Sequence, residues 1–126
     1  MRLATRIFKT AEFMKFATKA KIPDGILVES IERVERGLVD ADLGGGILKL
    51  RVARPNEGRR GGYRTIVACI VGRRAFFVFG FGKNNAANIE SSELQRFRRL
   101  GEVLQSLDDS MLDRAVNAKE LSEIER

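Results

Sequence analysis

Basic side chains dominate the stretch from residue 47 to residue 83. It holds nine bases and one acid, Glu57, and the bases are Lys49, Arg51, Arg54, Arg59, Arg60, Arg64, Arg73, Arg74 and Lys83. Charge that only solubilises a protein mixes both signs, so this bias indicates an anion-binding surface. The simpler alternative is that exposed bases keep the protein in solution and block pairing of sheet edges. Because arginine forks match phosphate geometry, we expect a polyphosphate backbone as the anion, with affinity that falls as salt rises.

Several common catalytic and metal-binding groups are missing. The chain has no histidine and one cysteine, Cys69, which excludes the usual zinc constellations and an internal disulfide. Cys69 lies in the most apolar strand pattern and is expected to act as a small buried hydrophobe in a reducing, cytoplasmic compartment. Asp40 and Asp42 precede a glycine triplet, which favours a turn over an oxygen cage for a metal. We therefore expect neither a metal nor any other cofactor.

Length and composition predict a single domain over residues 1–126. The chain is 44% hydrophobic and contains only two prolines, which is typical of a folded core. Its start has no apolar signal-like region, and no apolar run approaches the roughly 20 residues of a membrane span. Secretion and membrane insertion are not expected.

Three β-rich runs, at residues 47–54, 63–71 and 74–83, are separated by turn-forming residues and predict an antiparallel meander. Successive side chains alternate across a sheet, so Leu48 and Leu50 face a core while Lys49 and Arg51 face the other way. The middle run is apolar on both faces, as in a central covered strand. Glycines within the last run mark a bulge or a surface that another group approaches closely.

The flanking segments predict a strand and helices. Residues 3–8 are β-prone, Thr10 stands at an N-cap position, and Pro23 suits the first turn of a second helix. The apolar stripe of that second helix is Leu27, Ile31, Val34 and Leu38. Ser92 and Gln95 form a capping-box pattern that opens a third helix, and Ser110 opens a fourth that runs through Leu121.

The tail differs in charge from the meander. Residues 91–126 carry six bases and eight acids. A segment of this charge is not expected to touch a polyanion. We therefore expect it to pack on the back of the sheet or to meet another protein.

The motifs Asp-Leu-Gly-Gly-Gly (residues 42–46), Gly-Gly-Tyr-Arg-Thr (61–65) and Phe-Phe-Val-Phe-Gly-Phe-Gly-Lys-Asn (76–84) occur in this order. With the strand and helices before them, the chain resembles, over nearly its whole length, the RelE/HigB-like toxins of bacterial type II toxin–antitoxin modules, in the RelE/ParE superfamily. The resemblance implies an α+β RelE-like fold with an N-terminal strand and two helices, an antiparallel meander and C-terminal helices. It also implies cutting of messenger RNA on the ribosome and a cognate antitoxin, commonly of helix-turn-helix type.

The resemblance also implies site residues. Lys49 and Arg51 match the basic positions of the family's Lys-x-Lys/Arg strand, Arg64 matches the arginine of its Gly-Tyr-Arg motif, and Lys83 matches the lysine after the last strand. These four are the candidate catalytic residues. The residues expected to bind RNA around them are Arg54, Arg59, Arg60, Arg73, Arg74 and Asn84, the last at a position where relatives often carry arginine.

RNA cleavage by attack of the 2′-hydroxyl needs a base, positive charge on the phosphorane and help for the leaving 5′-oxygen. Lysine and arginine can supply all three. Neighbouring cations disfavour the protonated form of a lysine, so Lys49 is the expected base. Two alternatives stay open from the sequence, which are a ParE-like toxin that acts on DNA gyrase and a non-catalytic nucleic-acid-binding regulatory module.

Overall fold

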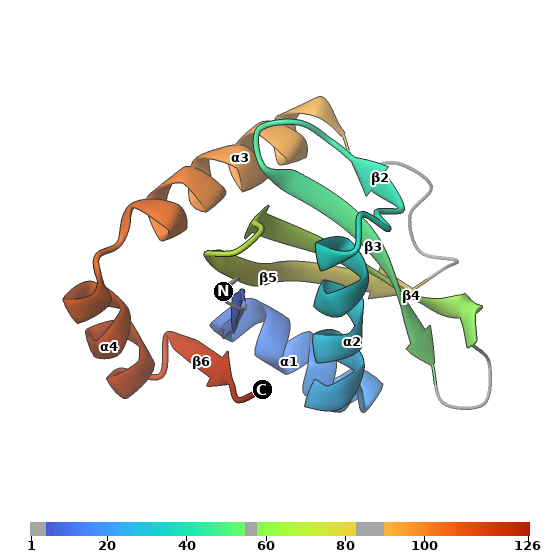
Figure 1. Ribbon diagram of the computed structural model, residues 1–126, viewed down its shortest axis with the longest axis horizontal. Helices are drawn as coiled ribbons and strands as arrows, with labels where there is room; N and C mark the ends of the chain where they lie inside the picture. Colours follow the sequence, from blue (N-terminus) through green and yellow to red (C-terminus); the bar gives the residue numbers. More distant parts are fainter. Residues whose placement is uncertain (1–4, 55–57, 83–89) are drawn as a thin grey trace.

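A computed structural model describes residues 5–54, 58–82 and 90–126, with the backbone only at 54 and 58–61. The fold is α+β (Figure 1). Its elements are β1 (Arg6–Thr10), α1 (Ala11–Ala20), α2 (Asp24–Glu35), β2 (Ala41–Asp42), β3 (Ile47–Arg54), β4 (Gly58–Ile70), β5 (Arg74–Gly82), α3 (Ser91–Ser106), α4 (Asp109–Asn117) and β6 (Leu121–Ile124). Within these described residues, every helix is too short or too polar to cross a membrane.

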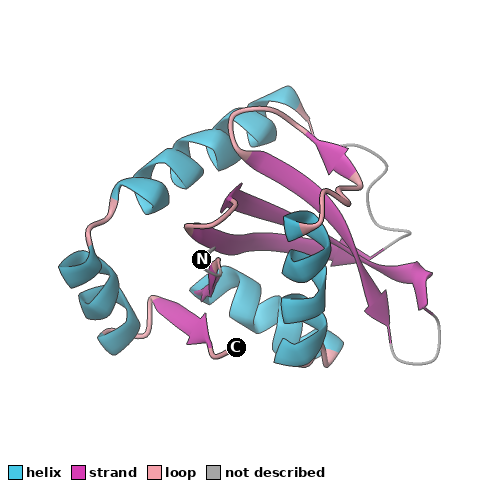
Figure 2. Cartoon of the chain, viewed as in Figure 1, coloured by secondary structure: helices cyan, strands magenta, loops and turns pink. Residues whose placement is uncertain are grey.

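The strands form one twisted sheet in the order β2-β3-β4-β5-β1-β6 (Figure 2). The predicted antiparallel meander is confirmed as β3, β4 and β5. The sheet as a whole is mixed, because β1 pairs in parallel with β5 and β6 then pairs antiparallel with β1. The parallel pair was not predicted, since the pairing partner of a lone N-terminal strand is set by tertiary packing.

Helices cover both faces of the sheet, and each face has its own apolar core. Helices α1 and α2 pack with the side chains of one face, where Phe13, Leu27, Leu50 and Phe77 are almost completely buried. Helices α3 and α4 pack on the other face, around Phe8, Ile66, Phe76, Phe97 and Leu112. Strand β4 is buried on both faces from Thr65 to Ala68, as its pattern predicted.

The N-terminal helices begin where the sequence indicates. The Thr10 side chain accepts a hydrogen bond from the backbone N–H of Phe13 at 3.2 Å, and α2 starts directly after Pro23. The end of α2 differs from the prediction. Leu38 lies beyond the helix and is 48% exposed, because α2 ends at Glu35 and Gly37 turns the chain with φ of +86°.

Two predictions for the C-terminal segment were wrong. Helix α3 starts at Ser91 after Glu90, with no side-chain cap, so Ser92 does not open a capping box. Helix α4 starts at Asp109, because the carboxylate of Asp108 accepts a bond from the N–H of Met111 at 2.8 Å. The helix stops at Asn117, and Leu121 belongs to strand β6.

The predicted position of the tail was also wrong. Helix α3 lies on the sheet face that carries Lys49 and Arg51, which we call the cationic face. A Cβ built on Gly101 would lie 3.1 Å from the Cβ of Ala68 and 3.2 Å from the Cδ1 of Ile47. The tail therefore covers one end of this face, where the residues are apolar, and leaves the charged end to the meander.

Arg126 joins the C-terminal segment to the N-terminal half. Its guanidinium donates to both carboxylate oxygens of Glu35, at 2.8 and 3.1 Å, and to the backbone carbonyl of Thr5 at 2.8 Å. The N–H of Thr5 donates to the same carboxylate at 3.1 Å. The hydrogen bonds from Arg126 lead the causes that lower the pKa of Glu35 from 4.5 to about 2.

We expect Arg126→Ala to lower the free energy of unfolding by about 2 kcal/mol at neutral pH, because it removes charge-assisted bonds from a half-buried carboxylate. The stabilisation from Glu35 is present above pH 4.5 and is lost as pH falls toward 2. Urea denaturation between pH 7 and pH 2.5 would measure this, and the difference between wild type and variant should shrink across that window. Glu125→Gln, one residue away and outside the cluster, is the matched control, and an equal loss in it would contradict the assignment.

Candidate functional site

Two rows of side chains cross the charged end of the cationic face. The strand register sets Arg51 opposite Arg64 and Arg64 opposite Phe81, which together we call the outer row. The same register sets Lys49 opposite Ile66 and Ile66 opposite Phe79, which we call the inner row. Directly opposed residues in an antiparallel pair have Cβ atoms about 5 Å apart. Lys49, Arg51 and Arg64 are thus neighbours, as their assignment to one site requires.

A bulge in β5 brings the two phenylalanines to this face. Val67 pairs with Phe77 but Ile66 pairs with Phe79, so Val78 is the extra residue. Beyond the bulge Phe79 and Phe81 belong to the apolar cluster on the α3 side. Gly80 faces the other way, where a Cβ would lie 2.3 Å from the ring of Phe16. The prediction that strand glycines mark a bulge or a close approach is confirmed for Gly80.

The three cations differ in exposure but share an absence of acidic partners. Arg51 is exposed, while Lys49 and Arg64 are half-buried. Arg64 donates from Nη1 to the carbonyl of Gly62 at 3.2 Å. Within the described ranges none of the three forms an ion pair with a carboxylate. Like charges directly opposed in a sheet are destabilising, so an anion bound between Arg51 and Arg64 would relieve a repulsion.

The turn before β3 supports this site. The Asp42 carboxylate accepts from the N–H of Gly44 at 2.9 Å, which confirms the predicted turn. Arg98 of α3 donates to the carbonyls of Leu43 and Gly44. A Cβ on Gly45, whose φ is +63°, would come within 3.0 Å of the Arg98 side chain. Glycine is favoured there by its positive φ and because a side chain would press on the arginine that ties the turn to α3.

Asp40 acts on the edge of β3. Its carboxylate accepts a bond from the backbone N–H of Arg51 at 2.7 Å. The short strand β2 ends its pairing at Ala41, opposite Lys49. Asp40 therefore extends the ladder by one side-chain bond and fixes the backbone from which Arg51 projects.

Two of the predicted RNA-binding residues lie at the opposite end of the sheet. Arg73 is exposed in the β4–β5 turn, far along both strands from Arg64. Arg74 is only 8% exposed, and its guanidinium donates to the carbonyls of Leu107 and Gln105 and to Asp109. These internal bonds favour a structural role for Arg74, which holds the α3–α4 connection, over the predicted contact with RNA.

The remaining predicted site residues are not tested by the structure. Lys83 and Asn84 lie outside the described residues. The backbone of Arg54, Arg59 and Arg60 belongs to β3 and β4, but their side chains are not among those described. Their roles stay predictions.

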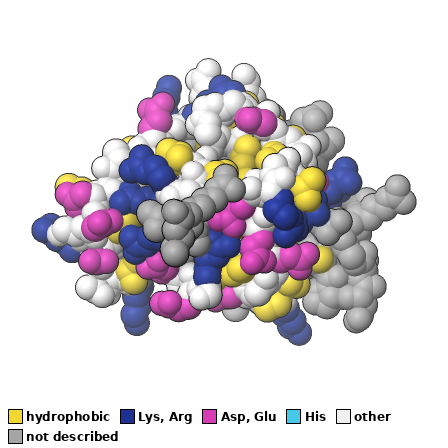
Figure 3. All heavy atoms as spheres, in the orientation of Figure 1, with side chains coloured by type: hydrophobic (Ala, Val, Ile, Leu, Met, Phe, Trp, Pro, Cys, Tyr) yellow, Lys and Arg dark blue, Asp and Glu magenta, His cyan; other side chains and the backbone are white. Residues whose placement is uncertain are grey.

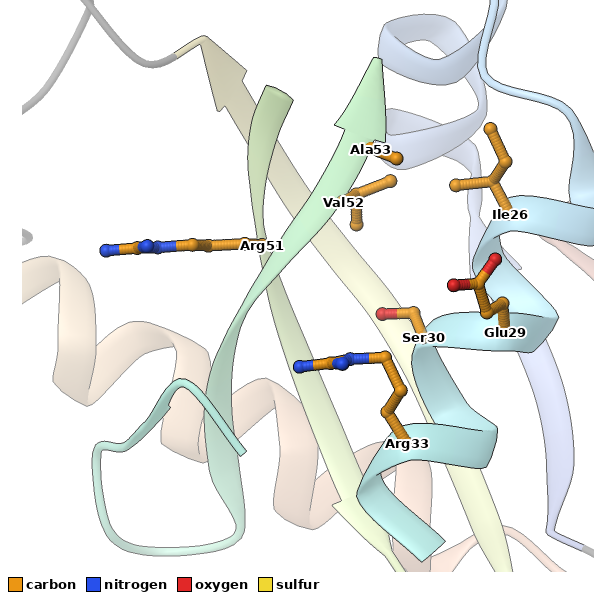
Figure 4. A pocket seen from close by; sticks show the side chains of 7 residues that line it. All are labelled: Ile26, Glu29, Ser30, Arg33, Arg51, Val52 and Ala53. Atoms are coloured by element: carbon orange, nitrogen blue, oxygen red, sulfur yellow. The ribbon is translucent and has the colours of Figure 1, made fainter. Parts of the chain in front are cut away.

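A small pocket lies on the other side of β3 and does not belong to this site. It is lined by α2 and the strand, through Ile26, Glu29, Ser30, Arg33, Arg51, Val52 and Ala53 (Figure 4). Figure 4 shows the guanidinium of Arg51 pointing away from α2 and from the other lining residues. The pocket thus shares the strand with the cations but not their face.

One face of the molecule carries charges of both signs. Figure 3 shows acidic and basic side chains interspersed on the face turned to the viewer. Among the described residues there is no group of three or more potential metal-ligating side chains. Burial raises the pKa of the Cys69 thiol to about 11, so this cysteine is a poor nucleophile at neutral pH.

The site combines three neighbouring cations with two aromatic rings on a sheet face that a helix only half covers. Such an arrangement can bind a phosphodiester and stabilise negative charge on it, and it defines a small α+β domain with a candidate polyanion-binding sheet. The model of the family described as RelE toxin of RelE/RelB toxin–antitoxin systems matches residues 5–124. The chain belongs to this family of toxins, as its resemblance predicted. A search of curated proteins gives no significant match.

Sequence reasoning missed three contributors to the site. Phe79 and Phe81 were read only as strand residues, and the signal that could have placed them was the glycine between them. Arg98 was read as one charge in an acidic tail. Its position one turn after Leu94 on a helix gives no indication that it reaches the glycine turn at residues 43–46.

We expect Arg51→Gln to raise the free energy of unfolding by about 0.5 kcal/mol at low salt, because it removes the repulsion from Arg64. The gain should shrink as salt screens the pair. Arg74→Gln, the matched control, should lower the free energy of unfolding by about 2 kcal/mol because it leaves buried carbonyls without their donor. Urea denaturation at two ionic strengths measures both, and a destabilised Arg51→Gln would show that no uncompensated repulsion exists at this site.

Proposed function

We propose that this protein is a ribosome-dependent endoribonuclease that cuts messenger RNA and so inhibits translation. Membership of the RelE family makes it a toxin of a toxin–antitoxin system. The observation that carries the catalytic proposal is the adjacency of Lys49, Arg51 and Arg64 on the open end of the cationic face. The proposed partner in the cell is a cognate antitoxin of helix-turn-helix type.

The chemistry follows from the side chains present. A 2′-hydroxyl attacks the adjacent phosphorus, the bond to the 5′-oxygen breaks, and a 2′,3′-cyclic phosphate forms. Lys49 takes the proton of the hydroxyl, while Arg51 and Arg64 neutralise the phosphorane. Lys83 is proposed to assist the leaving oxygen. The orientation of Arg64 by the Gly62 carbonyl reduces the reorganisation needed to reach the phosphate.

The electrostatic cost of the site fits this role. Two guanidinium groups held opposite each other are unfavourable in the free protein, but they become favourable once a doubly charged phosphorane lies between them. The gain is larger in the transition state than in the ground state because the phosphorane carries more negative charge than the phosphodiester. Differential stabilisation of this kind raises the rate of the chemical step.

We expect expression without an antitoxin to arrest growth and to produce new 5′ ends within messenger RNA, and Arg64→Ala to abolish both. The reason is that Arg64 is central in the outer row, between Arg51 and Phe81. Mapping of RNA ends after induced expression is the measurement. The exposed Arg73→Ala, at the far end of β4, is the control and should stay toxic.

The same experiment separates the alternatives. Growth arrest without new RNA ends, together with trapped DNA breaks, would indicate action on gyrase. Binding of nucleic acid without growth arrest would indicate a regulatory module. Undiminished cleavage by a folded Arg64→Ala protein would refute the site assignment.

The role of Lys49 predicts a distinct pattern of substitutions. If Lys49 is the base, Lys49→Arg should reduce cleavage about as much as Lys49→Ala, since a guanidinium does not deprotonate. Removal of the ammonium should cost on the order of 10²–10⁴ in rate. Single-turnover cleavage of a fixed messenger on intact ribosomes measures these rates.

Chelator treatment of the enzyme alone provides the companion control. Magnesium must stay high enough to keep ribosomes intact, so treated and untreated enzyme are compared on identical ribosomes. We expect equal rates, because a chain without histidine and with one acid in residues 47–83 offers few metal ligands. Activity that returns only when metal is added back to the enzyme, or an active Lys49→Arg protein, would contradict the proposed mechanism.

A further inference from the structure

The outer row ends in an aromatic side chain that the proposed cleavage chemistry does not use. Phe81 stands opposite Arg64 in the β4–β5 ladder and faces the same side as Arg51. Its side chain is half-buried, and the register places it beside Arg64. Apolar rings interleaved with bases on an open sheet are typical of surfaces that bind single-stranded nucleic acid.

The ring of Phe81 is supported from one direction. Its centroid lies 6.1 Å from that of Phe79, which lies 5.5 Å from the buried ring of Phe97 in α3. No other aromatic contact to Phe81 occurs among the described residues. Helix α3 therefore anchors a chain of three rings that ends at the cations. A ring held in this way loses little conformational freedom when a planar partner stacks on it.

We propose that Phe81 is a stacking platform for a nucleobase of single-stranded RNA whose phosphate lies at Arg64 and Arg51. The inference rests on the proposed function, because it assigns the base next to the phosphate that those arginines hold. The arginines contact any sequence equally, and the stacked ring orients the nucleotide so that its 2′-hydroxyl and phosphorus align. Phe81 is thus a positioning residue.

A purely structural role for Phe81 is the competing explanation, since the ring also packs at the rim of the α3 cluster. Phe81→Leu separates the two roles. It keeps an apolar side chain of similar size for the cluster and removes the π-face. Phe81→Tyr keeps the π-face and should behave as wild type.

The test uses a short 2′-O-methyl RNA, which cannot be cleaved by 2′-hydroxyl attack, with 2-aminopurine placed at each position in turn. Wild-type protein should quench the fluorophore at one position. Phe81→Leu should abolish the quenching and weaken binding about tenfold to a hundredfold, while Phe81→Tyr retains both. Tyr63→Leu is the matched control, because it removes a ring from the opposite face of β4, and it should leave quenching intact.

The salt dependence of RNA binding separates loss of base stacking from loss of a phosphate contact. Phe81→Leu should leave the slope of log Kd against log salt unchanged, whereas Arg51→Gln should reduce its magnitude by about 1. Equal quenching by wild type and Phe81→Leu, or no quenching by wild type at any position, would overturn the inference. Its failure is separate from that of the proposed function. If the protein cleaves RNA but binds it equally well without Phe81, only the stacking platform is refuted. If a base stacks on Phe81 but no RNA is cleaved in cells, only the nuclease activity is refuted.

Discussion

The close contact between α3 and the strands at Gly101 determines where the sheet is core and where it is open. A Cβ at Gly101 would press on the side chains of Ala68 and Ile47, so glycine lets the helix backbone come this near without displacing them. The contact fixes the crossing point of α3, and from there Phe97 reaches the apolar end of β5 while Arg98 reaches the glycine turn. Beyond that crossing point, among the described residues, Arg51 is exposed while Lys49 and Arg64 are half-buried.

Local patterns predicted the meander, the Thr10 cap, the stripe of α2 as far as Val34 and the face of Lys49 and Arg51, because each depends on alternation or on a hydrogen bond within a few residues. Strand pairings between distant segments were not predictable in this way. The parallel β1–β5 pair and strand β6 depend on contacts across most of the chain. The prediction that the tail packs on the back of the sheet was wrong for the same reason, since net charge does not indicate which end of a face a helix covers.

The sequence does not distinguish the arginines that hold the fold together from those at the candidate site. Their hydrogen-bond partners in the structure do. Arg74 and Arg126 have their donors occupied by carbonyls and carboxylates, so each joins segments far apart in the chain. Arg51 and Arg64 face each other, and among the described residues neither guanidinium forms an ion pair with a carboxylate. The partnered arginines thus lie at the far end of the sheet and at the C-terminus, while the opposed pair lies at the charged end of the meander. This division is expected where a surface must bind an anion.

The extra residue at Val78 makes β5 behave as two short strands joined out of phase. Before it, Phe76 and Phe77 point to opposite faces of the sheet, and each packs in one of the two cores. After it, the alternation is reset, so Phe79 and Phe81 face α3 and Gly80 faces Phe16 of α1. If Val78 paired as a regular strand residue instead of bulging, the outer half of the strand would be inverted, which would turn Gly80 toward the arginines and two phenylalanine rings toward α1. A change of pairing at one residue, without any change of side chain, would then replace an aromatic surface by a bare one.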